Sequence, residues 1–139
     1  VPKFNIGEGL TVKEGHDITI LSVGNIIENV IQVASKLDEK GVSARVISFP
    51  CIKPLNYEYI ENIAKNMKPI FTIEEHGAIG GFGSSISELL MESKYSGVFF
   101  KKIALPDICH STIGSQIFLR EKNGLNVDAI IKNILNYVQ

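Results

Sequence analysis

The sequence lacks the features that mark several large classes of protein. Its 139 residues carry a formal net charge of −1, so there is no excess of basic residues. A surface for nucleic acid or an anionic membrane would need such an excess. No apolar run approaches the roughly 20 residues of a membrane span. We therefore expect neither nucleic acid nor a membrane as a partner.

Cysteine is scarce as well. Only Cys51 and Cys109 occur, without CxxC spacing. This argues against a zinc framework or a thioredoxin-type redox motif and favours a reduced, cytoplasmic setting. The chain starts with Val1 rather than methionine, and no signal peptide opens it. We expect a domain excised from a longer chain.

The composition that remains is typical of one globular domain. Hydrophobic residues make up 45% of the chain and charged residues 21%, which excludes a disordered or low-complexity protein. A chain of this length can bury roughly two thirds of its unfolded surface. We expect a single domain over residues 1–139 that needs neither a disulfide nor a structural metal.

The hydrophobic period alternates between strand-like and helix-like segments. Strands are predicted at 18–23, 44–49, 69–74 and 97–103, and helices at about 26–37, 56–67, 84–90, 115–122 and 126–138. The strand segments are apolar almost throughout, as in strands covered on both faces. The alternation predicts a mainly parallel sheet with helices on both faces. A further apolar stretch at residues 4–6 predicts an edge strand, whose direction the pattern leaves open.

Loops beyond the carboxyl ends of such strands form the natural crevice. The richest in glycine is EEHGAIGGFGSS at residues 74–85, which leads into a predicted helix N-terminus. Free N–H groups there could hold a phosphate or carboxylate. However, the glycine spacing does not match a dinucleotide fingerprint, and no Walker lysine follows. Tight packing of helix against strand is the favoured interpretation, and anion binding is the alternative.

The polar side chains of these loops make no complete catalytic set. Neighbouring strand residues point to opposite faces, so Glu74 and Glu75 are not expected to form a carboxylate pair. His76 is expected to make a loop hydrogen bond or an interface contact, and His16 and His110 to be solvated. Both cysteines are expected to be packed and inert. We predict no catalytic, cofactor-binding or metal-binding residue.

The segment IKPLN at 52–56 has a structural explanation. Pro54 favours an extended geometry at Lys53. Asn56 is a candidate N-cap for the next helix, with Leu55 packed beneath it. Lys53 is either a solvated lysine or a side chain that enters the crevice.

In sequence order these motifs resemble the C-terminal domain of the transketolase family of thiamine-diphosphate enzymes. The resembling segments are DITILSVG at 17–24, LDEKGVSARVI at 37–47, IKPLN at 52–56, TIEEH at 72–76, GGFGS at 80–84, then Glu88, Asp107, Gly114 and NGL at 123–125. They span nearly the whole chain. The segments at 52–55, 74–76 and 80–81 look most like the short C-terminal transketolase subunits.

The resemblance implies a three-layer α/β/α fold with a five-stranded mixed sheet, whose first strand, at residues 4–6 or close by, is antiparallel. It implies an assembly or regulatory domain of a transketolase that transfers two-carbon ketol units between sugar phosphates. Thiamine diphosphate and Mg²⁺ would be held by separate pyrimidine-binding and diphosphate-binding domains of the same enzyme, in a cytoplasmic homodimer. The alternatives within the family are 1-deoxyxylulose-5-phosphate synthase and the β subunit of a 2-oxoacid dehydrogenase.

Outside the family, a free-standing anion-binding module and a pure interaction module remain as alternatives. We expect the chain alone to be inactive and not to bind thiamine diphosphate. The candidate residues for an interface or anion site are Lys53, Glu75, His76, Gly80, Gly81, Ser84 and Asp107.

Overall fold

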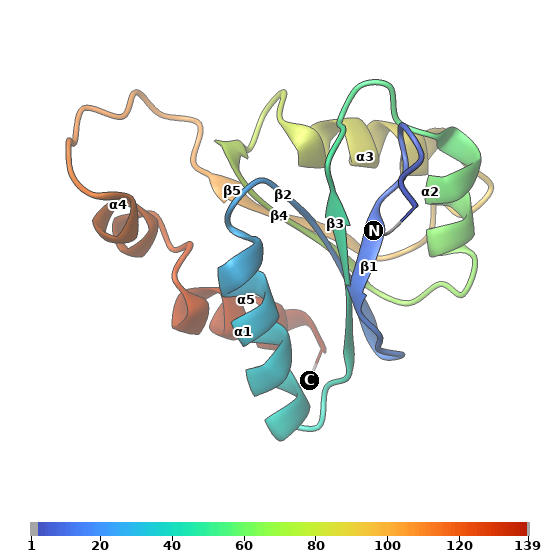
Figure 1. Ribbon diagram of the computed structural model, residues 1–139, viewed down its shortest axis with the longest axis horizontal. Helices are drawn as coiled ribbons and strands as arrows, with labels where there is room; N and C mark the ends of the chain where they lie inside the picture. The colour runs from blue at the N-terminus through green and yellow to red at the C-terminus, as the bar shows by residue number, and fades with distance from the viewer. Residues whose placement is uncertain (1–2, 139) are drawn as a thin grey trace.

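The computed structural model describes residues 3–138 and has one central sheet between two layers of helices (Figure 1). The strands are β1 (Leu10–Lys13), β2 (Ile18–Val23), β3 (Ala44–Phe49), β4 (Ile70–Gly77) and β5 (Phe100–Leu105). The helices are α1 (Ile27–Glu39), α2 (Tyr57–Ala64), α3 (Phe82–Glu92), α4 (Gln116–Lys122) and α5 (Val127–Val138). Among the described residues, no helix is long and apolar enough to cross a membrane.

The sheet has the strand order β1-β3-β2-β4-β5. β1 runs antiparallel to β3, and the other neighbouring strands are parallel. The predicted mixed sheet with an antiparallel first strand is therefore confirmed. Residues 4–6 are not part of it, because the strand starts at Leu10. Phe4 and Ile6 are 49% and 68% exposed, so these apolar side chains do not pack against the sheet.

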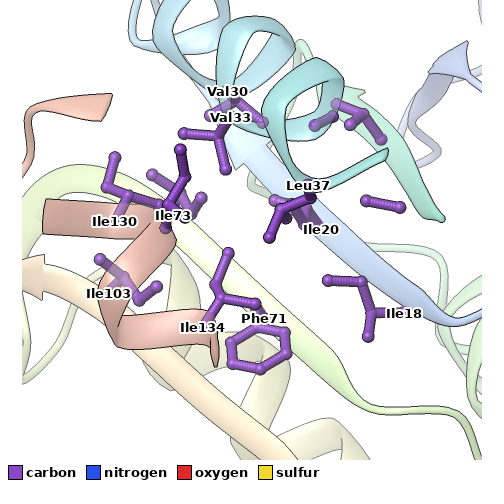
Figure 2. Packing of buried hydrophobic residues seen from close by; sticks show 14 of the residues in the cluster. Ile18, Ile20, Val30, Val33, Leu37, Phe71, Ile73, Ile103, Ile130 and Ile134 are labelled. Atoms are coloured by element: carbon purple, nitrogen blue, oxygen red, sulfur yellow. The ribbon is translucent and has the colours of Figure 1, made fainter. Parts of the chain in front are cut away.

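Alternating side chains of the strands build a separate core on each face of the sheet. Ile20, Phe71 and Ile73 lie on the face that α1 and α5 cover, where Figure 2 shows them packed against the helices. Leu21, Ile47 and Ile70 belong to the core beneath α2 and α3. Burying one such side chain contributes about 1.5–3 kcal/mol. Two buried faces explain why the central strands are apolar almost throughout.

Several helix ends lie where the sequence places them. The Asn56 side chain accepts a hydrogen bond from the Tyr59 N–H at 3.1 Å, which confirms it as the cap of α2. Asn126 accepts in the same way from Ala129 at 2.9 Å, at the start of α5. After α1, Gly41 has a φ of +80°, a left-handed conformation that glycine adopts readily. These local signals fix the lengths of the connections around the sheet.

The segment before β1 is held on α2 by polar contacts. The Tyr59 hydroxyl donates to the Gly9 carbonyl at 2.9 Å, and the Asn56 N–H donates to the Gly7 carbonyl at 2.9 Å. Partial burial is the largest cause that raises the pKa of Tyr59, and the nearby Glu8 adds to it, while Arg45 and the Gly9 hydrogen bond act against it. The edge strand is thus joined to the helical layer as well as to β3.

Candidate functional site

The end of β4 directs two consecutive carboxylates to opposite sides of the sheet. Glu74 lies on the α3 side, where it contacts Gly83, and Glu75 lies on the other side, where it contacts Arg120. The two carboxylates therefore do not share a site, as strand geometry predicts. Each instead ties a different helix to the carboxyl end of the sheet.

Glu74 is fully buried and caps α3 from the neighbouring strand. Its Oε1 accepts a hydrogen bond from the Gly83 N–H at 2.7 Å, and its Oε2 lies 3.0 Å from Nδ1 of His76. A buried carboxylate is costly unless such partners satisfy it. Here a helix N-terminus and an imidazole supply them. The positive end of α3 is thus already occupied by a carboxylate of the chain itself.

The glycines of the loop make room for this carboxylate. A Cβ at Gly81 would lie 2.6 Å from Glu74 Oε2 and 2.7 Å from the Gly77 carbonyl oxygen. A Cβ at Gly83 would lie 2.5 Å from Glu74 Oε1. Both separations are too short for a side chain, so the GGFG sequence and the buried glutamate form one structural unit. This supports the packing interpretation of the loop.

Ser84 and Lys102 close the loop from the other side. The Ser84 hydroxyl accepts from the Gly80 N–H at 3.0 Å and from Lys102 Nζ at 3.3 Å. Ser84 and Lys102 both donate to the Ala78 carbonyl. Gly80 itself has a φ of +79°, which requires the conformational freedom of glycine. Ser84 therefore has a structural role within the turn, and Lys102 is a contributor that the sequence did not indicate.

Glu75 fixes α4 through a bidentate ion pair. Arg120 Nε and Nη2 donate to the two carboxylate oxygens at 2.6 and 3.0 Å. Gln116 Nε2 lies 3.2 Å from both oxygens, and Asn25 accepts from Arg120 at 3.1 Å. The hydrogen bond to Glu75 is the main cause that raises the pKa of Arg120. Sequence reasoning missed Arg120 and Gln116 because 45 and 41 residues separate them from Glu75.

Residues 106–122, here called the arm, leave the sheet after β5 and comprise a long loop and α4. Figure 1 shows the loop arching away from the sheet before α4 begins. No residue of α4 is buried. The large apolar side chains that the arm exposes are Ile108, Ile113, Ile117 and Phe118. The arm is therefore the main apolar surface at this end of the described chain.

The two cysteines differ in their surroundings. Cys51 is partly buried, and its Sγ donates to the Lys53 carbonyl at 3.3 Å. Cys109 is exposed on the arm, so the expectation of a packed thiol is wrong there. The exposed arm leaves no core for that side chain to enter. His110 beside it is exposed, and the His16 side chain is 82% exposed, as expected for both.

A hollow of about 240 Å³ lies against the glycine loop and is here called the His76 hollow. His76 and Ser85 are the polar side chains that line it, together with the backbone of Gly80 and Gly81. Lys53 lines an adjoining hollow of about 360 Å³, which shares Ile52 and Ser85 with the first. A larger space of about 590 Å³, between Lys36 and Lys132, lies at the C-terminal end of α1, far from these loops.

The predicted interface or anion-site residues thus separate into groups. His76, Gly80 and Gly81 meet at the His76 hollow, with Lys53 next to it. Ser84 is used within the glycine turn. The other two lie elsewhere, with Glu75 on the opposite face of the sheet and Asp107 exposed on the arm. Whether these groups bind an anion or a partner stays a prediction.

The match to known families decides what kind of domain this is. Residues 7–130 match the family described as the transketolase C-terminal domain. The chain belongs to this family. The resemblance read from the ordered motifs is therefore confirmed, and so is the fold that it implied.

Two relatives of this transketolase-type domain share about a third of its residues. The chain is 35% identical over 127 residues to a 1-deoxy-D-xylulose-5-phosphate synthase of Desulforudis audaxviator. The aligned region covers 91% of the chain and 20% of that protein. It is 36% identical over 131 residues to the enzyme of the same name from Bacillus mycoides. This aligned region covers 93% of the chain and 20% of that protein. The chain spans about one fifth of the length of these relatives.

Solved structures of transketolases have the same fold. A split-gene transketolase, described as an inactive β4 tetramer, superimposes with a TM-score of 0.86 at 28% identity, over 99% of this chain and 44% of that one. The transketolase of Campylobacter jejuni superimposes with a TM-score of 0.64 at 17% identity, over 94% of this chain and 18% of that one. The second likeness is one of fold alone.

The described residues do not fit the diphosphate cofactor of these enzymes. A diphosphate is held through Mg²⁺, which takes oxygen ligands such as carboxylates. Between residues 3 and 138, no three His, Cys, Asp or Glu side chains are placed together to hold a metal ion. No chemical step of the cofactor is therefore assigned to this part of the chain.

Proposed function

We propose that the chain is the C-terminal assembly domain of a thiamine-diphosphate-dependent, transketolase-type enzyme that transfers two-carbon ketol units between sugar phosphates. The match of residues 7–130 to the transketolase C-terminal domain carries the proposal. Pyrimidine-binding and diphosphate-binding domains of the same cytoplasmic enzyme supply the cofactor site and the catalytic groups. Residues 1–139 form one domain of that larger dimeric assembly.

The arm is the surface through which this domain joins the rest of the enzyme. Four large apolar side chains are exposed there within eleven residues, and α4 has no buried residue of its own. A patch of this kind on a folded domain is typical of a protein–protein contact. The matching relatives are about five times as long as this domain, so most of their chain is available to cover it. Glu75 holds the arm in place through Arg120.

The test is to isolate the enzyme assembled on this chain from its source cells, through a tag on the chain, and to assay it. With thiamine diphosphate, Mg²⁺ and sugar phosphates, we expect ketol transfer to co-purify with the chain. The variant Ile113→Glu/Ile117→Glu should lose this activity because it places charge in the contact. Met91→Glu, at a position on α3 whose side chain is 72% exposed, is the control. Absence of ketol transfer from the wild-type assembly contradicts the proposal.

A second candidate is 1-deoxy-D-xylulose-5-phosphate synthase, another thiamine-diphosphate enzyme. It is favoured by sequence identity, since the two relatives of that name are 35% and 36% identical and the split-gene transketolase 28%. The same purified assembly distinguishes the two candidates. Mass spectrometry that finds 1-deoxy-D-xylulose 5-phosphate as the product, without ketol transfer between sugar phosphates, selects the second.

A further inference from the structure

The His76 hollow holds two polar side chains that no described residue satisfies. Between residues 3 and 138, no partner hydrogen-bonds to His76 Nε2 or to the Ser85 hydroxyl, and both side chains line the hollow. The apolar Ile52 and Ile79 flank them. Polar side chains that line one hollow beside apolar residues can fix the orientation of a small bound molecule.

Glu74 determines which nitrogen of His76 is free. Nδ1 of the ring lies 3.0 Å from the buried carboxylate, which can only accept a hydrogen bond, so Nδ1 carries the proton. In the neutral ring, Nε2 is then the nitrogen with the lone pair. The His76 side chain is 43% exposed, so a ligand can reach it. Glu74 therefore leaves a hydrogen-bond acceptor, Nε2, on a residue that lines the hollow.

Capping of α3 alone does not explain the burial of Glu74. A serine or aspartate at the N-cap position would satisfy the same helix N–H groups without removing a glutamate carboxylate from water. Instead, position 81 is a glycine whose missing Cβ leaves space for the glutamate. What this arrangement adds beyond a cap is the fixed orientation of His76.

These features select the chemical class of ligand. The carboxylate behind His76 and on the N-terminus of α3 disfavours an anion. A hydroxyl group suits both free side chains, because it can donate to Nε2 and accept from Ser85. At about 240 Å³ the hollow is smaller than the roughly 300–1,000 Å³ of drug-sized sites. We propose that the His76 hollow binds a small neutral molecule through a hydroxyl group held between His76 Nε2 and Ser85.

The test uses glycerol as the probe and NMR of the isotope-labelled 139-residue chain. We expect saturable shifts of the His76 ring and of the Gly80, Gly81 and Ser85 amides. Long-range proton–nitrogen spectra should show the proton of His76 on Nδ1. Ser85→Ala should weaken binding about two- to tenfold, the value of one hydrogen bond. Ser87→Ala is the matched control, since its hydroxyl donates to the Ser84 carbonyl.

Glu74→Gln separates orientation from folding. Its amide oxygen can still cap α3, while its NH₂ group donates to the ring and moves the proton to Nε2. We expect this variant to stay folded, to show the exchanged tautomer and to bind glycerol more weakly. Chemical-shift changes that rise linearly with glycerol concentration, without saturation, overturn the proposal. So do amide shift changes that stay the same in His76→Ala. Saturation by inorganic phosphate in place of glycerol also overturns it and identifies an anion site.

Discussion

Glu74 links three features at the residue scale: the cap of α3, the orientation of His76 and the glycines at 81 and 83. Each feature depends on a carboxylate that is fully buried and whose two oxygens are both hydrogen-bonded. Because the carboxylate is enclosed, it cannot move aside when a neighbouring atom is added. The spacing of the glycines is therefore a consequence of packing.

Substitution of Gly81 should show this directly. In Gly81→Ala, the new Cβ would lie 2.7 Å from the Gly77 carbonyl oxygen and 2.8 Å from His76 Cβ, and we expect a loss of about 1 kcal/mol or more. Gly97→Ala is the matched control, since its Cβ would be 3.6 Å from the Met67 side chain. That change should stay within about 0.5 kcal/mol. Urea unfolding measures both, and equal stabilities would show that Gly81 has no packing role.

This residue-scale unit could not be predicted from the sequence. The usual N-cap residue lies next to the start of its helix. Here the capping carboxylate lies nine residues before Gly83 and on another element. Glu74 meets the helix only after β4 has entered the sheet. For the same reason the predicted start of α3 was late, at Ser84 instead of Phe82.

At the scale of elements, α4 is held in position by the Glu75–Arg120 ion pair, to which Gln116 and Asn25 add hydrogen bonds. It has seven residues and no buried side chain, and an isolated helix of that length is unstable in water. Arg120→Ala should therefore raise the hydrogen exchange of α4 amides. The free energy of global unfolding should change by no more than about 1 kcal/mol, because Glu75 is partly exposed. Lys36→Ala removes an exposed ion pair on α1 and should leave α4 unchanged. Undiminished protection in Arg120→Ala would rule out this role.

The contact of α2 with the segment before β1 makes stability depend on pH. The pKa of Tyr59 is raised in the folded chain, chiefly by burial. The unfolded chain therefore loses this proton first as the pH rises. The stabilisation is present below the unfolded pKa of about 10 and is lost as the pH rises through the folded pKa. In urea unfolding between pH 8.5 and 11, Tyr59→Phe should lose stability less steeply than the wild type. Parallel pH profiles would contradict this assignment.

The strands differ in how well the sequence predicts where they begin and end. β2 and β3 begin and end where predicted, because both faces of each strand are buried and the apolar run is continuous. β1 has four residues, of which the middle two are exposed and the outer two only partly buried, so its pattern does not distinguish it from a loop. It is positioned by Gly9, which packs directly against Ile47 and Phe49. That contact involves residues about 40 positions away and is not visible locally.

At the scale of the whole molecule, the chain spans only about a fifth of the relatives that it matches. We predict that the isolated chain does not bind thiamine diphosphate, since its described residues include no cluster of metal ligands. Calorimetry with thiamine diphosphate and Mg²⁺ should give no saturable heat. The same titration of the complete enzyme assembly is the positive control. Micromolar binding by the chain alone would move the cofactor site into these residues.

The two adjacent glutamates of β4 also bear on how the strand finds its place during folding. A slip of one residue against β2 and β5 would exchange the faces of Glu74 and Glu75. In a slip that moves Glu74 into the place of Ile73, the Glu74 carboxylate would leave Gly83 and His76 and enter the apolar core beneath α1 and α5. A misaligned sheet would thus carry an unpaired buried charge, which is costly. The same pair of residues that anchors two helices therefore penalises the nearest misfolded register.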